Sequence, residues 1–131
     1  MTTTRILLVD DHEVVREGLR ALLARREGFE IVGQAGTVEQ AIAEAARSEP
    51  DVIVMDVRLP DGSGIEACRE IRETRPETKV IMLTSYADDD AVFASILAGA
   101  AGYVLKQTRG SALADAIAAV ARGESDRKSV V

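Results

Sequence analysis

Short, nearly uninterrupted apolar segments alternate along this chain with longer amphipathic stretches. The apolar segments are residues 6–9, 29–34, 52–57, 79–84 and 102–105. Continuous apolar segments are typical of strands buried on both faces, and strands that alternate with helices favour a parallel sheet. The sequence therefore predicts an α/β fold built from about five strand–helix units.

The amphipathic stretches predict the helices. The first is expected to end at Gly28, the second lies between Thr37 and Pro50, and the others span residues 65–74, 88–98 and 111–122. Residues 59–64 are predicted to be a loop in which Asp61 is a turn residue. The apolar stripe of the first helix consists of Val14, Val15, Leu19, Leu22 and Leu23.

Right-handed crossovers leave few ways to connect such units. The best fit is a doubly wound, flavodoxin-like sheet of five parallel strands in the order 2-1-3-4-5. In this architecture, ligands bind at the carboxyl ends of the strands. Polar residues at those ends are therefore the first candidates for a functional site.

Five polar side chains fall at predicted strand ends. A parallel sheet brings them all to one edge, where chance alone rarely gathers carboxylates, a hydroxyl and an ammonium. For Asp11, an ordinary role as cap of the following helix is an equal alternative. Asp56 lies in an apolar strand, where an unpaired charge is costly and burial raises the pKa of a carboxyl. The five are Asp10, Asp11, Asp56, Thr84 and Lys106.

Clustered carboxylates favour a hard, oxygen-seeking cation such as Mg²⁺ or Mn²⁺. A carboxylate beside such an ion can attack phosphorus and form an aspartyl phosphate. Lys106 and the Thr84 hydroxyl would then stabilise the phosphoryl oxygens. His12 is not assigned to the metal, because imidazole is a poor match for Mg²⁺.

Composition excludes several functions. The 131 residues carry a net charge of −6, the basic residues are scattered, and aromatic residues make up 3% of the chain, so this domain alone is not expected to bind nucleic acid. No apolar run approaches the roughly 20 residues of a membrane helix, and no signal peptide is expected. Cys68 is the only cysteine, which rules out an intrachain disulfide. A cytoplasmic location is expected.

Four motifs, in order and spacing, resemble the receiver domains of bacterial two-component response regulators, the CheY-like family. They are LLVDDHEVV, VIVMDVRLPDGSGIE, VIMLTSY and AGAAGYVLK. The resemblance spans about Arg5 to Gly123, and DDHEVVREGL points to the NarL/FixJ branch in particular. One departure is Gln107, which stands after Lys106 where many receivers have proline.

The resemblance implies a role for each site residue. Asp56 would accept a phosphoryl group from a sensor histidine kinase. Asp10, Asp11 and the backbone carbonyl of Arg58 would hold Mg²⁺ together with Asp56. Thr84 and Tyr103 would form the switch, and Lys106 would pair with the phosphoryl group.

The resemblance also implies regulation rather than enzymatic turnover. The output would be a changed face formed by the fourth helix, fifth strand and fifth helix. That face, or the first and fifth helices, would mediate homodimerisation on phosphorylation. Residues 1–123 are expected to be the receiver, and residues 124–131 a tail or linker remnant. Related regulators often bind DNA through a C-terminal helix-turn-helix domain, and the eight residues after Gly123 are expected to be too few to form one.

Three other functions are alternatives to phosphoryl acceptance. A phosphatase of the haloacid-dehalogenase type would need DxDxT on the first strand, where this chain has DDHEV. A cobalamin-binding module would need DxHxxG, whose last position is Val15 here. The third is an inactive receiver that acts as an interaction module without phosphorylation, and the intact set of acidic residues argues against it.

Overall fold

A computed structural model describes residues 3–85, 89–106 and 110–123. The predicted tail 124–131, the expected helix start at Asp88, and Gln107 lie outside the described residues. The elements are β1 (Thr4–Val9), α1 (Glu13–Ala24), β2 (Phe29–Ala35), α2 (Val38–Ser48), β3 (Val52–Asp56), β4 (Arg58–Leu59), β5 (Gly62–Ser63), α3 (Gly64–Thr74), β6 (Lys79–Thr84), α4 (Asp89–Leu97), β7 (Gly102–Leu105) and α5 (Gly110–Ala121).

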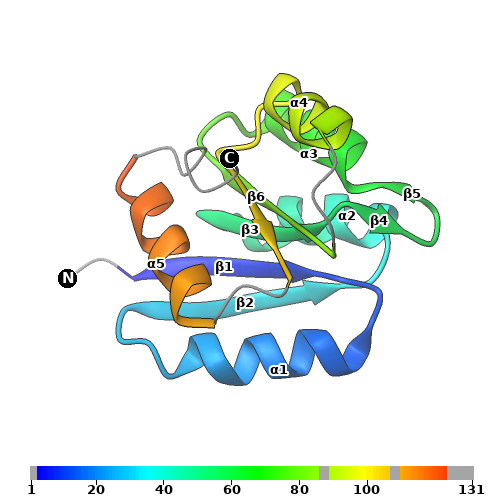
Figure 1. The fold of residues 1–131 in the computed structure, drawn as a ribbon. Coiled ribbons are helices and arrows are strands. Elements are labelled where there is room, and N and C mark those ends of the chain that lie inside the picture. The colour runs from blue at the N-terminus through cyan, green and yellow to red at the C-terminus, as the bar shows by residue number, and fades with distance from the viewer. Residues whose placement is uncertain (1–2, 86–88, 107–109, 124–131) are drawn as a thin grey trace.

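The main sheet has five parallel strands in the order β2-β1-β3-β6-β7. Because β4 and β5 stand apart in a small hairpin, this is the order 2-1-3-4-5 predicted from the sequence, and the prediction is confirmed. Figure 1 shows the helices on both faces of the sheet.

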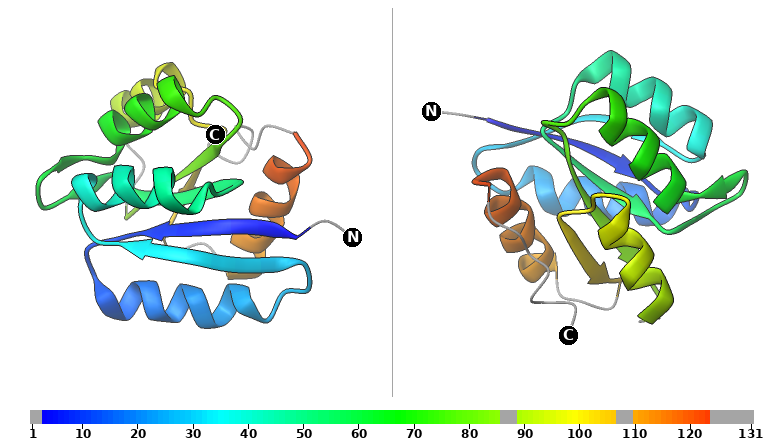
Figure 2. Two further views of the ribbon diagram at one scale, coloured as in Figure 1. Left: turned by 180° about the vertical axis from the view of Figure 1, so that it is seen from behind. Right: turned by 90° about the horizontal axis from the view of Figure 1, so that it is seen from above.

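Alternate residues of each strand feed two separate apolar clusters, because successive side chains point to opposite faces. Leu7 and Val9 of β1 join the cluster that packs against α2, α3 and α4. Ile6 and Leu8 join the cluster that packs against α1 and α5. The two views of Figure 2 show these helix layers on either side of the strands.

The apolar stripe predicted for α1 is only partly correct. Leu23 is fully buried, but Val14 is 85% exposed and Leu22 is 40% exposed. Val14 and Val15 are neighbours, so about 100° of helix rotation separates them and both cannot face the sheet. Leu22 lies against α5, where a Cβ atom added to Gly110 would meet its side chain.

The segment predicted as a loop at residues 59–64 overlaps the β4–β5 hairpin, which starts one residue earlier at Arg58, and its last residue, Gly64, already begins α3. The strands pair antiparallel, with Arg58 opposite Ser63 and Leu59 opposite Gly62. Two-residue strands are too short to show a hydrophobic period, so no pattern in the sequence predicts them. The hairpin begins two residues after Asp56 and contributes Arg58 to the rim of the site.

Candidate phosphoacceptor and metal site

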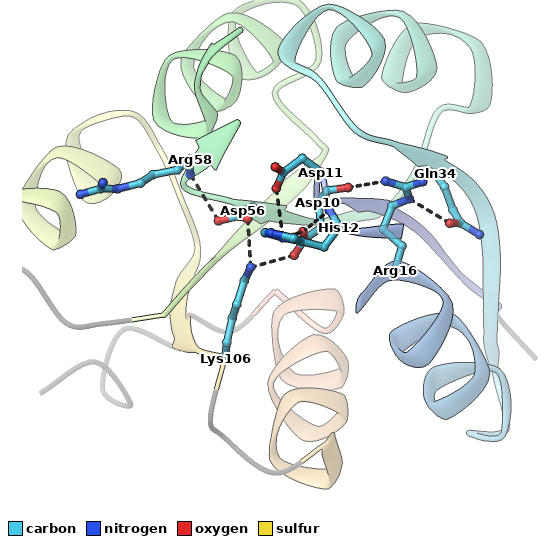
Figure 3. A network of polar contacts seen from close by, with 8 residues as sticks. All are labelled: Asp10, Asp11, His12, Arg16, Gln34, Asp56, Arg58 and Lys106. Carbon is cyan, nitrogen blue, oxygen red and sulfur yellow. Dashed lines mark hydrogen bonds and ion pairs between the residues drawn. The ribbon is translucent and has the colours of Figure 1, made fainter. Parts of the chain in front are cut away.

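Asp10 follows β1 and is buried, with 1% of its surface exposed. Its Oδ1 atom accepts a hydrogen bond from the backbone N–H of His12 at 2.9 Å. The Arg16 guanidinium donates to the backbone carbonyl of Asp10 and, at 3.1 Å, to Oε1 of Gln34 (Figure 3). The end of β1 is thus fixed from both α1 and β2.

Asp11 and His12 lie on the open side of Asp10. The Nδ1 atom of His12 is 3.0 Å from Asp10 Oδ1 and 3.2 Å from Asp11 Oδ1. His12 occupies the N-cap position of α1 and its side chain makes no capping bond. Asp11 therefore does not cap the helix, and its carboxylate faces the acidic cluster instead.

Asp56 ends β3 and is 6% exposed. Its Oδ1 atom accepts a hydrogen bond from the backbone N–H of Arg58 at 3.3 Å. Gly64, the first residue of α3, lies directly against its main chain: an added Cβ would be 2.0 Å from the Asp56 carbonyl oxygen. The backbone at Asp56 is held in place by this contact, which only glycine permits.

Lys106 joins the two buried carboxylates. Its Nζ atom lies 2.9 Å from Asp10 Oδ2 and 3.0 Å from Asp56 Oδ2 (Figure 3). Burial alone would lower the pKa of Lys106, but its hydrogen bonds to Asp10 and Asp56 outweigh that effect and raise it. The ammonium therefore stays charged and offsets the repulsion between the carboxylates.

The remaining predicted residues fall in two places. The side chain of Thr84 is buried, and together with Lys106 and Asp56 it lines a pocket of about 190 Å³. The Arg58 side chain also lines its rim and extends away from Asp56 (Figure 3). Tyr103 is 4% exposed and belongs to the core cluster against α2, α3 and α4, outside the pocket lining. The other lining residues are Asp11, His12 and Ser85.

Four residues offer ligand atoms that all lie within 4.8 Å of one another: Asp10, Asp11, His12 and Asp56. Three carboxylates form a donor set that fits a hard divalent cation. The sequence does not favour His12 as a ligand of Mg²⁺, yet the structure places its ring among these carboxylates. The one indication of this placement in the sequence is that His12 directly follows Asp10 and Asp11.

Ionised Asp56 is expected to destabilise the metal-free fold. Burial raises the pKa of Asp56, and the ion pair with Lys106 and the Arg58 N–H offset this only in part. Below the pKa of the unfolded chain the carboxyl is protonated in both states and costs nothing. As pH rises from the pKa of the unfolded chain through the raised pKa of the folded state, the unfolded chain ionises first, and the free energy of unfolding falls.

Asp56→Asn should therefore be more stable than the wild type at pH 7 in chelator, and the difference should shrink towards pH 4. Thermal unfolding across this pH range measures it. A gain that is equal at both pH values would contradict the assignment of the effect to ionisation of Asp56.

Comparison with known proteins identifies the family. Residues 6–118 match the family described as the response regulator receiver domain, and the chain belongs to this family. It is 49% identical over 121 residues to the DNA-binding transcriptional activator DevR/DosR of Mycobacterium tuberculosis, an alignment that covers 92% of this chain. The chain spans 56–59% of the length of the curated relatives it matches.

Solved structures agree with the fold. A LuxR-family two-component response regulator from Aurantimonas matches with a TM-score of 0.91 and 38% identity, covering 95% of this chain and 89% of that one. The isolated receiver domain of RcsB from Salmonella, determined in the presence of the phosphomimetic BeF₃⁻, matches with a TM-score of 0.88 and 26% identity over 98% of this chain and 96% of that one.

These findings confirm the predicted receiver domain and support its place in the NarL/FixJ-type branch. Receiver domains are regulatory rather than classical enzymes, so the phosphatase alternative is dropped, as is the cobalamin-binding module. Among the helices of residues 3–85, 89–106 and 110–123, none combines the length and the hydropathy that a membrane-spanning segment needs.

Proposed function

We propose that this domain accepts a phosphoryl group on Asp56 from a sensor histidine kinase. The observation that carries the proposal is the placement of the buried Asp56 carboxylate, with Lys106 Nζ 3.0 Å away and Asp10 sharing the same ammonium. A carboxylate at the carboxyl end of a parallel strand is open to a ligand on the strand-end side. The pocket beside Asp56 can accommodate a phosphoryl group.

The carboxylates of Asp10, Asp11 and Asp56 would hold Mg²⁺ or Mn²⁺, with the Arg58 backbone carbonyl as a further ligand. The support is the close grouping of carboxylate oxygens and the acidic pocket typical of receiver domains. When bound, the cation supplies positive charge to the phosphoryl oxygens.

In the proposed transfer, an Asp56 carboxylate oxygen attacks the phosphorus of a phosphohistidine. The new O–P bond forms as the P–N bond breaks, and the histidine nitrogen leaves with the electron pair. Lys106 stands beside the attacking group and would pair with the transferred phosphoryl oxygens. Thr84 would donate its hydroxyl hydrogen to one of them.

Phosphorylation would then shift an existing equilibrium of the switch residues Thr84 and Tyr103, and with it the face formed by α4, β7 and α5. Phe93 and Leu97 of α4 are 64% and 67% exposed, so this face already presents apolar surface. We propose homodimerisation on phosphorylation through this face or through α1 and α5.

We further propose that residues 1–123 act as the receiver of a longer cytoplasmic regulator, with residues 124–131 as the segment that follows. The control of transcription would then reside in a DNA-binding domain outside this chain. DevR/DosR, whose name describes a DNA-binding activator, supports this by similarity.

Intact-protein mass after incubation with acetyl phosphate tests the proposal. One phosphoryl adduct is expected, and only with Mg²⁺ present. The Asp56→Asn variant should show none. An adduct on that variant, or none on the wild type under any condition, would contradict the proposal, and the latter result would favour a receiver that acts without phosphorylation.

A further inference from the structure

The β4–β5 hairpin ties the phosphoacceptor to the rim of its own pocket. It begins two residues after Asp56, and the N–H of Arg58 at its base donates to Asp56 Oδ1 at 3.3 Å. The Arg58 carbonyl, a proposed metal ligand, belongs to the same residue. A contact that holds the hairpin in place therefore also affects the geometry of the cation site.

Asp61, at the tip of this hairpin, is bound to a different part of the fold. Its Oδ1 atom accepts a hydrogen bond from the backbone N–H of Val38 at 2.7 Å, and its Oδ2 atom accepts one from Glu39 at 3.1 Å. These hydrogen bonds lower the pKa of the Asp61 carboxyl, the one from Val38 most, so the carboxylate stays ionised. A Cβ added to Gly62 would lie 3.6 Å from Val38 Cγ2, so the hairpin also packs close to the start of α2.

Helix α2 already has its own N-cap. The Thr37 hydroxyl oxygen accepts a hydrogen bond from the N–H of Gln40 at 3.0 Å. The N–H groups that Asp61 binds are at the exposed first turn, where water can also satisfy them. The main effect of Asp61 is therefore on the position of the hairpin. Its hydrogen bonds hold the hairpin tip against the start of α2, where Glu39 lies 22 residues earlier in the chain.

We propose that Asp61 is a positioning residue for the cation of the phosphoacceptor pocket. By holding the hairpin tip on α2, it fixes the position of Arg58, whose backbone carbonyl is the proposed ligand beside Asp10, Asp11 and Asp56. The inference rests on the proposed function. Residues that orient a metal ligand without touching the metal typically change affinity by 10- to 100-fold when they are replaced. Because the hairpin base is also held, by the Gly64 N–H to Val57 carbonyl bond at 2.7 Å, we expect the lower end of that range.

The test measures the Mg²⁺ concentration that gives half-maximal phosphorylation by acetyl phosphate, and the rate at saturating Mg²⁺. Asp61→Ala should raise the half-maximal concentration about tenfold and leave the saturated rate near that of the wild type. Asp61→Asn keeps one carbonyl oxygen as an acceptor and should give an intermediate value. Mg²⁺-dependent amide shifts in NMR spectra provide the same comparison without phosphorylation.

Thr37→Ala is the matched control. It removes the N-cap side chain of α2 and should lower the thermal unfolding midpoint, as the loss of other N-caps does. Since it leaves the hairpin anchor intact, its half-maximal Mg²⁺ concentration should equal that of the wild type. An unchanged Mg²⁺ dependence in Asp61→Ala, or an equal shift in Thr37→Ala, would overturn the positioning role. A wild-type protein that neither binds Mg²⁺ nor forms an adduct would instead overturn the proposed function itself, and this inference with it.

Discussion

Replacing Lys106 with methionine is expected to destabilise the fold by about 3 kcal/mol in metal-free buffer. The side chains of Asp10 and Asp56 are 2% and 8% exposed, and both contact the Lys106 ammonium. Removing it leaves two buried carboxylates close together without this counter-ion, and breaking a buried ion pair in this way costs several kcal/mol. Urea unfolding in chelator measures the loss.

Mg²⁺ should restore much of that stability, because a divalent cation can neutralise the same carboxylates. The variant should therefore gain more from Mg²⁺ than the wild type does. Lys79→Met, at the opposite end of the sheet, is the matched control and should change stability by less than about 0.5 kcal/mol. Adding Asp56→Asn to Lys106→Met should recover part of the loss. A Lys106→Met variant as stable as the wild type in chelator would refute the role of the ammonium as the internal counter-ion.

Gly64→Ala is expected to have the second large effect. The added methyl group would lie 2.0 Å from the carbonyl oxygen and 3.0 Å from the carbonyl carbon of Asp56, both backbone atoms that cannot rotate away. Either β3 or the start of α3 has to move. We expect a loss of about 2–3 kcal/mol in unfolding free energy. Because small displacements of reacting groups cost about 100-fold in rate, phosphorylation should fall by at least about tenfold.

Gly18→Ala is the matched control, and its free energy of unfolding is expected to change in the opposite direction. Gly18 lies inside α1, and a Cβ atom placed there meets nothing within 4 Å. Alanine is favoured over glycine in a helix by about 1 kcal/mol, so this variant should be stabilised and phosphorylated normally. If Gly64→Ala behaved like Gly18→Ala, the close packing of α3 on Asp56 would not constrain the site.

The alternation of apolar segments was enough to predict the parallel sheet, because strands buried on both faces show a clear pattern. The strand order needed a second argument, the handedness of crossovers and the fit to a flavodoxin-like topology. It was less informative for α1. There, Val14 and Leu22 satisfied helical spacing, yet Val14 is 85% exposed. A one-dimensional period cannot tell a face that meets the sheet from one that meets water or a neighbouring helix.

The candidate site was partly predictable for a similar reason. Parallel strands brought Asp10, Asp56 and Lys106 to one edge, as the sequence indicated. The pairing itself, in which one ammonium bridges two carboxylates at 2.9 and 3.0 Å, depends on side-chain conformations that a pattern does not contain.

Two side-chain contacts at or beside the site were missed. Asp61 reads as a turn residue in its local sequence, but its carboxylate binds the start of α2. His12 reads as the start of a helix, but its ring lies between two carboxylates. In each case the side chain is polar and locally ordinary, and only the folded chain reveals its partner.

The most direct test of the account is to locate the phosphoryl group among the three carboxylates. Borohydride reduces an acyl phosphate to an alcohol, so it converts a phosphorylated aspartate to homoserine. Peptide mass spectrometry of the protein after acetyl phosphate, Mg²⁺ and borohydride should find homoserine at position 56 alone. Homoserine in place of Asp10 or Asp11, or an adduct that leaves Asp56 unmodified, would contradict the assignment of Asp56 as the phosphoacceptor.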